Sequence, residues 1–270
     1  MKKTLAVAFT TLLATVMTAT PAQAAPADPV KALAKQLAQG RGVSYTERSA
    51  VRAGNKSFFE RKGLLQYGKG GIVASDITAR LNVEDEPPKD SFDTDDKADL
   101  SFMEDPEQTI RIGRTSYVRG FIVETLMPKG KVWWKQSPGW TSGRSAMLGE
   151  LINAADPGTL KMMLVKSKRS GNTYAGEITL KELIKLSPWA RTTIWWGVND
   201  KAVVRWKLVV SASGLPHRLT TYSSFDKKKR AEIRYTGWGR DVSIKAPAAA
   251  TVTTKLKGAD GPFLPKAPNR

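Results

Sequence analysis

The chain has 270 residues, of which 41% are hydrophobic, and it contains no cysteine. This length allows one large domain or two small ones, and the hydrophobic content is sufficient for a core. The absence of cysteine excludes disulfides, thiolate metal sites, cysteine nucleophiles and lipid modification of a cysteine. The formal net charge of +18 favours anionic partners.

The first 24 residues have the three parts of a secretory signal. Lys2 and Lys3 form a charged start, residues 5–19 are apolar, and Ala-Gln-Ala at 22–24 fits a signal-peptidase site. An uncleaved anchor is the alternative, but the apolar run is shorter than the ~20 residues that span a bilayer. We therefore expect a mature protein that begins at Ala25, is secreted outside the cytoplasmic membrane and has no transmembrane anchor.

The positive charge is unevenly distributed along the chain. Residues 84–107 contain eleven acidic residues and two lysines, so the rest of the mature chain carries a net charge of +25. For an exported protein, such a basic body favours anionic lipid head groups, teichoic-type polymers and acidic glycans as partners. Nucleic acid is not expected, because the compartment is wrong and no nucleic-acid-reading motif is present. A solvated basic surface without a partner is the alternative.

The first half of the mature chain is predicted to contain one helix followed by strands. Asp28 and Pro29 favour a short helix that ends at Gly40. An acidic loop over 84–107 interrupts the strands that follow. Alternation with a period of two indicates strands over 42–52, 56–68 and 70–83, two within 108–124 joined at Gly113-Arg114, and one over 130–137.

The second half is predicted to contain helices and then strands again. Candidate helices cover 144–155 and 158–167, and a capping box formed by Thr179 and Glu182 begins a third helix that ends before Pro188. Residues 188–200 are not assigned. Further strands are predicted over 172–180, 203–211, 215–225, 230–236 and 242–245.

This order of elements indicates an α+β fold. About ten strands, mostly consecutive and antiparallel, are combined with helices at the start and in the middle. We expect one domain over residues 25–252, in which helices cover one face of a long antiparallel sheet. An irregular Pro/Gly tail follows over 253–270. Such an arrangement can leave an apolar space between the sheet and the helices.

The chain offers few groups for catalysis. His217 is the single histidine, and a triad needs a nucleophile and an orienting carboxylate beside it. The nearest match to a Gly-x-Ser-x-Gly elbow, around Ser145, lacks the second glycine. The acidic loop partly resembles an EF-hand, but Lys97 and Ala98 occupy positions that need a ligand and a glycine. We therefore predict a non-enzymatic protein with no catalytic residue, no metal site and no cofactor.

Tryptophans cluster in the second half of the chain. Trp133 and Trp134 are adjacent on a predicted strand, so their rings face opposite sides of the sheet. One ring can enter a core, whereas the other needs a second apolar environment. A ligand pocket or a membrane interface would supply it. A core position for each ring is the alternative.

The C-terminal third resembles a known family. VVRWKLVVSASGLPHRL (203–219) and IRYTGWGRDVSIKAPAAATV (233–252) are similar to the end of the actinobacterial LppX/LprAFG lipoproteins. Residues 112–120 and 130–139 resemble the central strands of that family. The resemblance implies a LolA-like fold, a curved antiparallel half-barrel with helices over its concave face and acyl chains of lipids or glycolipids in between. Named members are anchored by a lipidated cysteine, which this chain lacks, so a released carrier or scavenger is expected.

In such a half-barrel, one face of the strand from Trp206 would point toward the middle helix and the central strands. The candidate ligand-binding residues are therefore Ile112, Trp133, Trp134, Leu160, Met163, Leu164, Trp206, Leu208 and Val210.

The leading hypothesis is a secreted binding protein that carries or sequesters a lipid or other apolar ligand. One alternative is an envelope protein that binds anionic cell-wall polymer through its basic surface. Another is an extracytoplasmic sensor domain that signals through a second protein. An enclosed apolar cavity would favour the first hypothesis, and a filled core with one broad basic face would favour the second.

Overall fold

The computed structural model describes residues 27–51, 59–81, 105–141, 145, 149–193, 201–222 and 230–257. The expected signal sequence, most of the acidic loop and the tail beyond residue 257 lie outside these residues. The positions of the acidic loop that resemble an EF-hand also lie outside the described residues, and so do the adjacent Trp195 and Trp196. The expectations for these segments stay predictions.

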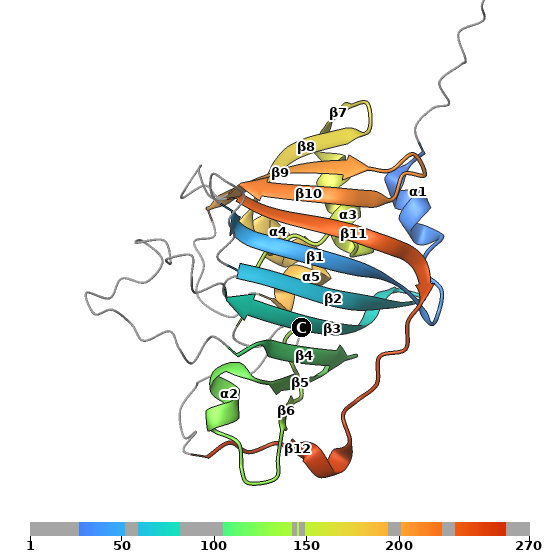
Figure 1. The fold of residues 1–270 in the computed structure, drawn as a ribbon. Helices are drawn as coiled ribbons and strands as arrows, with labels where there is room; N and C mark the ends of the chain where they lie inside the picture. The colour runs from blue at the N-terminus through green and yellow to red at the C-terminus, as the bar shows by residue number, and fades with distance from the viewer. Residues whose placement is uncertain are drawn as a thin grey trace, which may run out of the picture.

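One open sheet of 12 strands forms the frame of the molecule, in the order β12-β6-β5-β4-β3-β2-β1-β11-β10-β9-β8-β7 (Figure 1). Its pairings are antiparallel, except that β12 runs parallel to β6. The expected α+β fold with a large antiparallel sheet is thus confirmed. The strands are β1 (Arg41–Val51), β2 (Phe59–Gly68), β3 (Gly71–Leu81), β4 (Glu107–Ile112), β5 (Thr115–Arg119), β6 (Trp133–Gln136), β7 (Lys168–Ser170), β8 (Thr173–Thr179), β9 (Val203–Val210), β10 (Pro216–Tyr222), β11 (Arg230–Asp241) and β12 (Val252–Thr253).

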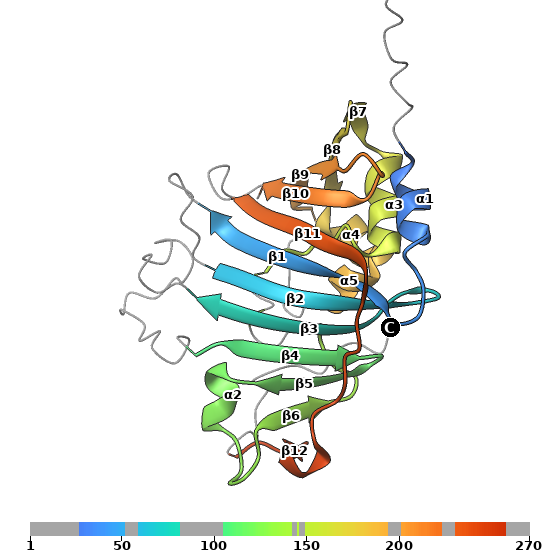
Figure 2. The same ribbon diagram turned by 45° about the vertical axis from the view of Figure 1, so that its right-hand side comes forward.

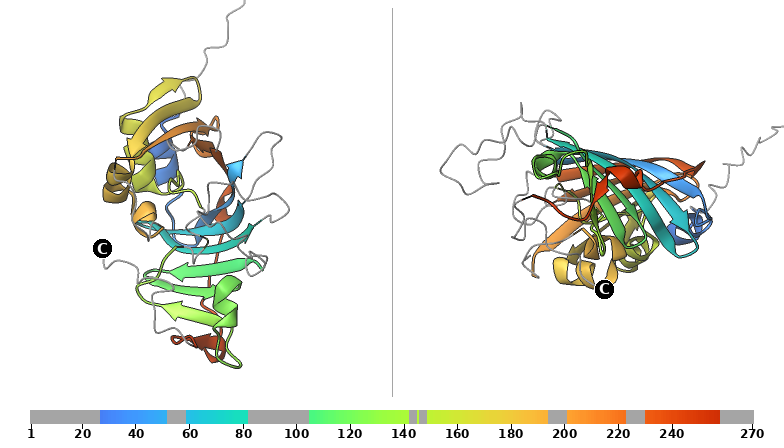
Figure 3. Two further views of the ribbon diagram at one scale, coloured as in Figure 1. Left: turned by 90° about the vertical axis from the view of Figure 1, so that its left-hand side faces the viewer. Right: turned by 90° about the horizontal axis from the view of Figure 1, so that it is seen from below.

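Helices cover the concave face of this curved sheet. Figure 2 and the left view of Figure 3 show α3, α4 and α5 together on that side, behind the half of the sheet that ends in β7. In the part of the chain that the structure describes, none of the helices is long and apolar enough to cross a membrane. The helices are α1 (Pro29–Ala34), α2 (Phe121–Thr125), α3 (Pro157–Val165), α4 (Leu180–Leu186) and α5 (Pro188–Arg191), with a 3-10 turn at Ala249–Thr251.

Two meanders of consecutive strands build the sheet. Strands β1 to β6 follow one another from the middle of the sheet toward one edge, and β11 back to β7 do so toward the other edge. The meanders meet where β1 pairs with β11, and Tyr45 lies opposite Tyr235 at this junction. A pairing between the beginning and the end of the domain therefore joins the two halves.

The helices begin where capping residues predict. The Asp28 carboxylate accepts hydrogen bonds from two backbone N–H groups of the first turn of α1. Asp156 accepts from the N–H of Thr159 at the start of α3 (2.9 Å). Thr179 and Glu182 form the expected capping box of α4. Each cap satisfies backbone donors that would otherwise have no partner within the helix.

Some expected elements are wrong. The second strand predicted within 108–124 ends at Arg119 and is followed by helix α2, because Gly120 adopts a positive φ of 78° and turns the chain at the end of β5. The strand predicted over 242–245 is not formed; β11 itself continues to Asp241, and the chain then leaves the sheet. Helix α1 ends at Ala34, short of the predicted end. Helix α5 and the short strands β7 and β12 have no counterpart among the expected elements.

The helix predicted over 144–155 is also wrong, for a reason that lies in the sheet. Its described residues 149–155 form turns and extended backbone. The N–H of Glu150 donates to a buried carboxylate of β1 (2.8 Å), and the N–H of Ala154 donates to the Tyr235 hydroxyl (2.9 Å). Side chains of the sheet thus take the backbone groups that a helix would have to pair internally.

A buried ion pair attaches residues 149–156, hereafter the strap, to the sheet. The Arg61 guanidinium donates to the Glu47 carboxylate through Nε (3.0 Å) and Nη2 (2.6 Å), and these side chains are 0% and 1% exposed. Arg61 Nη2 also donates to the Glu150 carbonyl (3.2 Å), while Glu47 accepts the Glu150 N–H (2.8 Å). A Cβ at Gly149 would lie 2.1 Å from the guanidinium carbon, so only glycine fits there.

Two buried tyrosines attach the strap further. The Tyr67 hydroxyl donates to the Ala155 carbonyl (2.9 Å). The Tyr235 hydroxyl donates to Asn153 Oδ1 (3.0 Å) and accepts from the N–H of Ala154 (2.9 Å). Because Tyr67 belongs to β2 and Tyr235 to β11, the strap is bonded to both meanders. It leads directly into α3 and thereby positions that helix.

The side chain of Glu150 has a proton affinity unusual for a glutamate. Its carboxyl accepts the N–H groups of Leu151 (2.9 Å) and Ile152 (3.0 Å) and the hydroxyl of Thr221. Burial raises the pKa of Glu150 to about 7; the hydrogen bond from Thr221 opposes the rise, and the nearby Glu47 carboxylate adds to it. An unfolded glutamate has a pKa of about 4.3. The folded chain therefore retains a proton between about pH 4.3 and pH 7 that the unfolded chain has lost.

We predict that the contribution of Glu150 to stability is present below about pH 4.3 and is lost as the pH rises through about 7. Glu150→Gln keeps the shape and removes the titration. The free energy of unfolding of the wild type, relative to this variant, should therefore fall between pH 5 and pH 8 in urea denaturation. Glu124→Gln on the exposed side of α2 serves as the control. The difference in free energy of unfolding between the wild type and this variant should not fall in the same way. A difference between wild type and Glu150→Gln that does not vary with pH would contradict the prediction.

Candidate functional site

Most of the predicted ligand-binding residues lie in the main core. Leu164 packs against this core from α3 and is partly buried. Side chains thus fill the space between the centre of the sheet and α3, and the ligand-binding role of these residues stays a prediction. The members that belong to the core cluster itself, each exposed by 3% or less, are Leu160, Met163, Trp206, Leu208 and Val210.

The remaining predicted residues lie in the other half of the sheet. Trp134 packs with Val118 in a smaller, separate cluster that includes α2. Trp133 is half-buried, and its ring centroid is 4.9 Å from the guanidinium carbon of Arg119. Ile112 is half-buried at the end of β4. The structure therefore does not bring these three predicted residues into the core cluster.

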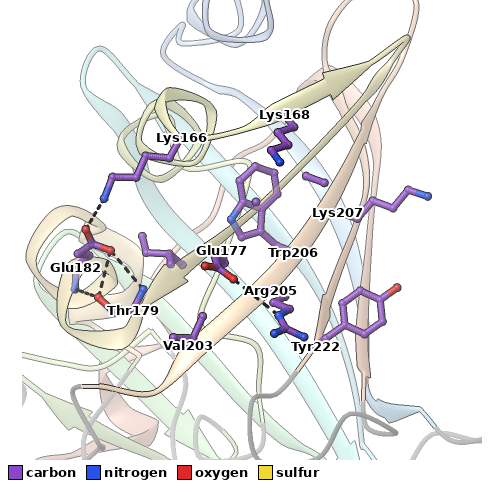
Figure 4. A pocket seen from close by; sticks show the side chains of 13 residues that line it. Lys166, Lys168, Glu177, Thr179, Glu182, Val203, Arg205, Trp206, Lys207 and Tyr222 are labelled. Atoms are coloured by element: carbon purple, nitrogen blue, oxygen red, sulfur yellow. Dashed lines mark hydrogen bonds and ion pairs between the residues drawn. The ribbon is translucent and has the colours of Figure 1, made fainter.

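An open pocket of about 860 Å³ lies at the β8 end of the sheet. Strands β8 and β9 form most of its lining, and the rest comes from the residue after α3, the start of α4, the first residue of β7 and Tyr222 at the end of β10 (Figure 4). Of the predicted ligand-binding residues, Trp206 lines this pocket. We call it the edge pocket.

The edge pocket exists because β7 is short. Its last pair with β8 joins Lys168 to Ala175, so β8 has no strand neighbour on its outer side from Gly176 onward among the described residues. A Cβ at position 176 would lie 2.7 Å from Cζ2 of Trp206. Glycine therefore allows the indole to lie directly on the backbone of β8, where it forms an apolar floor together with Ile178.

Charged side chains surround this apolar floor. Lys166 pairs with Glu182 (2.6 Å), and Arg205 lies 3.8 Å from Glu177 (Figure 4). Lys168, which lies on β7 opposite Ala175, lines the pocket and forms no ion pair within the described residues. The edge pocket thus combines an apolar surface with a cation that is free to pair with a ligand.

Sequence reasoning identifies Trp206 but not the rest of the edge pocket. The alternation over 172–180 predicts β8 correctly, yet it does not indicate where the neighbouring strand stops. One signal is present in the sequence: Gly176 interrupts a strand, and an isolated strand glycine often marks a close approach of another group. Lys168 carries no signal, because its place in the lining of the pocket depends on the fold.

The two residues considered for catalysis, His217 and Ser145, do not line the edge pocket. His217 is exposed on β10. Ser145 is buried, and its hydroxyl donates to the Glu107 carboxylate (2.5 Å), which also accepts the Ser145 N–H (3.2 Å). That serine is thus engaged in holding its own segment against β4. The expectation of a non-enzymatic protein stays a prediction.

Comparisons with known proteins found solved structures of low similarity. Protein-family models and curated proteins gave no match to the sequence. A LolA superfamily protein from Nitrosomonas europaea has a TM-score of 0.33 and 11% identity, over 80% of this chain and 93% of that chain. The lipoprotein LppX of Mycobacterium tuberculosis has a TM-score of 0.33 and 9% identity, over 80% and 99%. A DUF1329 family protein from Desulfovibrio piger has a TM-score of 0.30 and 12% identity, over 81% and 95%.

The core around α3 can be distinguished from a pocket lining by mutation. Met163 is 2% exposed, whereas Val165 on the same helix is 76% exposed. We expect Met163→Ala to lower the free energy of unfolding by about 2–5 kcal/mol, because it leaves a cavity in a filled core. Val165→Ala should change it by less than about 0.5 kcal/mol. Urea denaturation measures both, and similar values for the two variants would refute a filled core at Met163.

Proposed function

We propose that the protein is a secreted, non-enzymatic binding protein that holds the apolar chain of an anionic, lipid-like ligand in the edge pocket. The observation that carries this proposal is the presence of an apolar floor and the unpaired Lys168 in one open pocket of about 860 Å³. Small-molecule pockets typically have volumes of ~300–1,000 Å³, apolar walls and a few well-placed polar groups. The edge pocket has each of these properties.

The apolar part of the ligand would lie on the floor of the pocket. Trp206 presents a flat ring and Ile178 a branched side chain, and Gly176 adds no side chain that would obstruct the space above the strand. Burial of an alkyl chain there contributes about 0.8 kcal/mol for each methylene removed from water. A chain of several methylenes could therefore supply micromolar affinity without a large polar contribution.

The anionic part of the ligand would pair with Lys168. Of the other cations of the lining, Lys166 and Arg205 have carboxylate partners, whereas the exposed Lys207 forms no ion pair within the described residues. A carboxylate or phosphate head group would gain a charge-assisted hydrogen bond from the exposed ammonium group of Lys168. This division into an apolar floor and a cationic rim selects amphiphiles over purely apolar molecules.

The proposed location of this binding is outside the cytoplasmic membrane. The N-terminal signal pattern supports export, and the absence of cysteine from the chain supports release rather than lipid anchoring. The resemblance of residues 203–252 to lipid-binding lipoproteins supports a lipid-like ligand. A released protein with an open pocket could accept such a ligand from one surface and shield its chain from water.

A fluorescent fatty acid tests the proposal. We expect the mature protein to bind cis-parinaric acid saturably, and Trp206→Ala and Lys168→Glu to weaken binding by about tenfold or more, which corresponds to about 1.4 kcal/mol. Lys161→Glu makes the same change of charge on the exposed side of α3, away from the pocket, and should bind like the wild type.

The head-group assignment has its own control. A fluorescent alcohol with the same chain lacks the negative charge, so Lys168→Glu should leave its affinity unchanged while Trp206→Ala weakens it. If the wild type binds neither probe saturably, the edge pocket is not a lipid site. If Lys161→Glu and Lys168→Glu weaken the fatty acid equally, the attraction comes from net charge alone.

A second candidate function is favoured by a row of cations on the convex face. Lys62, Thr46, Arg234 and Arg218 lie opposite one another on β2, β1, β11 and β10. The three cations form no ion pair within the described residues. Neighbouring strands are ~4.8 Å apart, and like charges that face each other directly are destabilising. A polyanion lying across the strands would relieve this repulsion, as expected for an envelope protein that binds anionic wall polymer.

Salt dependence tests this second candidate. We expect Arg218→Gln combined with Arg234→Gln to weaken binding to a glycerol-phosphate polymer and to flatten the decrease of affinity with rising salt, because exposed charges are screened. Arg48→Gln is the matched control, since Arg48 is already paired with Glu60 (3.1 Å) in the adjacent row. Wild-type binding that is insensitive to salt, or equal effects of both changes, would contradict the candidate.

A further inference from the structure

A second polar pocket lies in the waist of the molecule, between β3–β4 and α5. Its volume is about 300 Å³, and it is separate from the edge pocket in all of its lining residues. Arg111 of β4 and Ser75 of β3 form one wall, and Trp189 and Arg191 of α5 form the other. The Thr141 N–H donates to the carbonyl of a residue just after α5 (2.8 Å), which closes one end. We call it the waist pocket.

Arg111 is the unusual residue of the waist pocket. It is half-buried, and its Nε is buried without a hydrogen-bond partner within the described residues. No carboxylate is paired with its guanidinium there. Burial without a counter-charge lowers the pKa of Arg111. Removing a cation from water without a counter-charge is unfavourable, so such an arginine requires a reason.

Unpartnered polar atoms gather around Arg111. Ser116 lies directly opposite it on β5, and Gln136 lies opposite Ser116 on β6. The Ser116 Oγ and the Gln136 Oε1 are buried without hydrogen-bond partners, and so is the Nε1 of Trp189 across the pocket. Buried polar atoms are nearly always bonded in native proteins. Ser116 and Gln136 do not line the waist pocket, whereas Arg111 and Trp189 do, so the pocket itself has two buried N–H donors without partners within the described residues.

The charge balance of the waist pocket favours an anion. Arg111 and Arg191 carry two positive charges, and Asp156 carries one carboxyl. Oδ2 of that carboxyl is engaged at the start of α3, where it accepts the N–H (2.9 Å) and the hydroxyl (2.7 Å) of Thr159. Arg191 donates from Nη1 to the Lys185 carbonyl (2.9 Å) and retains its other N–H groups. The free groups of the pocket are therefore mainly donors.

We propose that the waist pocket binds a phosphate group, with Arg111 as the principal donor and with Arg191 and the Trp189 N–H as supporting donors. The donors come from a strand and from a helix on opposite walls, which suits a tetrahedral group whose oxygens point in several directions. Arginine presents five N–H groups in a planar fork that matches such oxyanions. The phosphate group could belong to the free ion or to the head group of a lipid.

Binding of inorganic phosphate tests this site directly. In equilibrium dialysis of the mature protein with labelled phosphate, we expect saturable binding at one site, and Arg111→Met should weaken it by at least about tenfold, that is about 1.4 kcal/mol. Trp189→Phe should weaken it by a smaller factor. Arg80→Met is the control, since Arg80 is an exposed arginine on the neighbouring strand β3, and it should bind phosphate like the wild type.

A thermal measurement keeps the test valid if a variant folds poorly. Phosphate should raise the melting temperature of the wild type above that in sodium chloride of equal ionic strength, because a ligand stabilises the state that binds it. Arg111→Met should lose this increase and Arg80→Met should keep it. The proposal is refuted if the wild type binds no phosphate saturably, or if Arg111→Met binds it as well as the wild type.

Two further measurements identify the source of the phosphate group. Dihexanoyl phosphatidic acid, kept below its micelle concentration, should displace labelled phosphate if the site accepts a lipid head group. The displacement should persist in Lys168→Glu, which alters the edge pocket and leaves the waist pocket intact. If inorganic phosphate binds and the lipid does not displace it, the site takes the free ion. Failure of fatty-acid binding in the edge pocket would leave each of these results unaffected.

Discussion

The buried ion pair between Arg61 and Glu47 determines where the helices sit. Both charged groups also form hydrogen bonds with the backbone of the strap. If the strap left the sheet, the buried pair would lose these hydrogen bonds. Loss of one partner of such a buried pair typically costs about 3–5 kcal/mol. Because the strap leads into α3, the position of a helix at the margin of the sheet is set by charges at its centre. The shape of the edge pocket therefore depends on how the strap is held.

The candidate sites lie at the borders of the core rather than inside it. Leu160, Met163 and Leu208 are almost completely buried, which leaves little room between α3 and the middle of the sheet. Space remains where regular structure stops: beyond the end of β7, and between α5 and β4. The chemistry of the two places differs. The first offers an indole and two lysines without ion pairs within the described residues, and the second offers an arginine with an unpartnered Nε among both polar and apolar residues.

The sequence predicts the regular parts of this protein well and its sites poorly. Alternation and capping residues such as Thr179 and Asp156 depend on neighbours in the chain, so they indicate strands and helix starts correctly. The strap was predicted as a helix because its local pattern is helical, and the groups that prevent a helix, such as Tyr235, are distant in sequence. Trp206 could be recognised as a candidate from its strand. Lys168 and Arg111 could not be recognised, because what distinguishes them is the lack of an ion-pair partner within the described residues, and this depends on the fold.

The pairing of β1 with β11 has a consequence for how the chain is made. Tyr45 is among the first residues of the domain to be synthesised, and its neighbour Tyr235 is among the last. Contacts between such distant residues form slowly. For a chain that crosses a membrane through a narrow channel, this delay is useful, since the central seam cannot close before passage is nearly complete. During that interval β1 presents open backbone groups to any other extended chain. The time between delivery of the two strands therefore sets the period in which the newly made chain needs protection from aggregation.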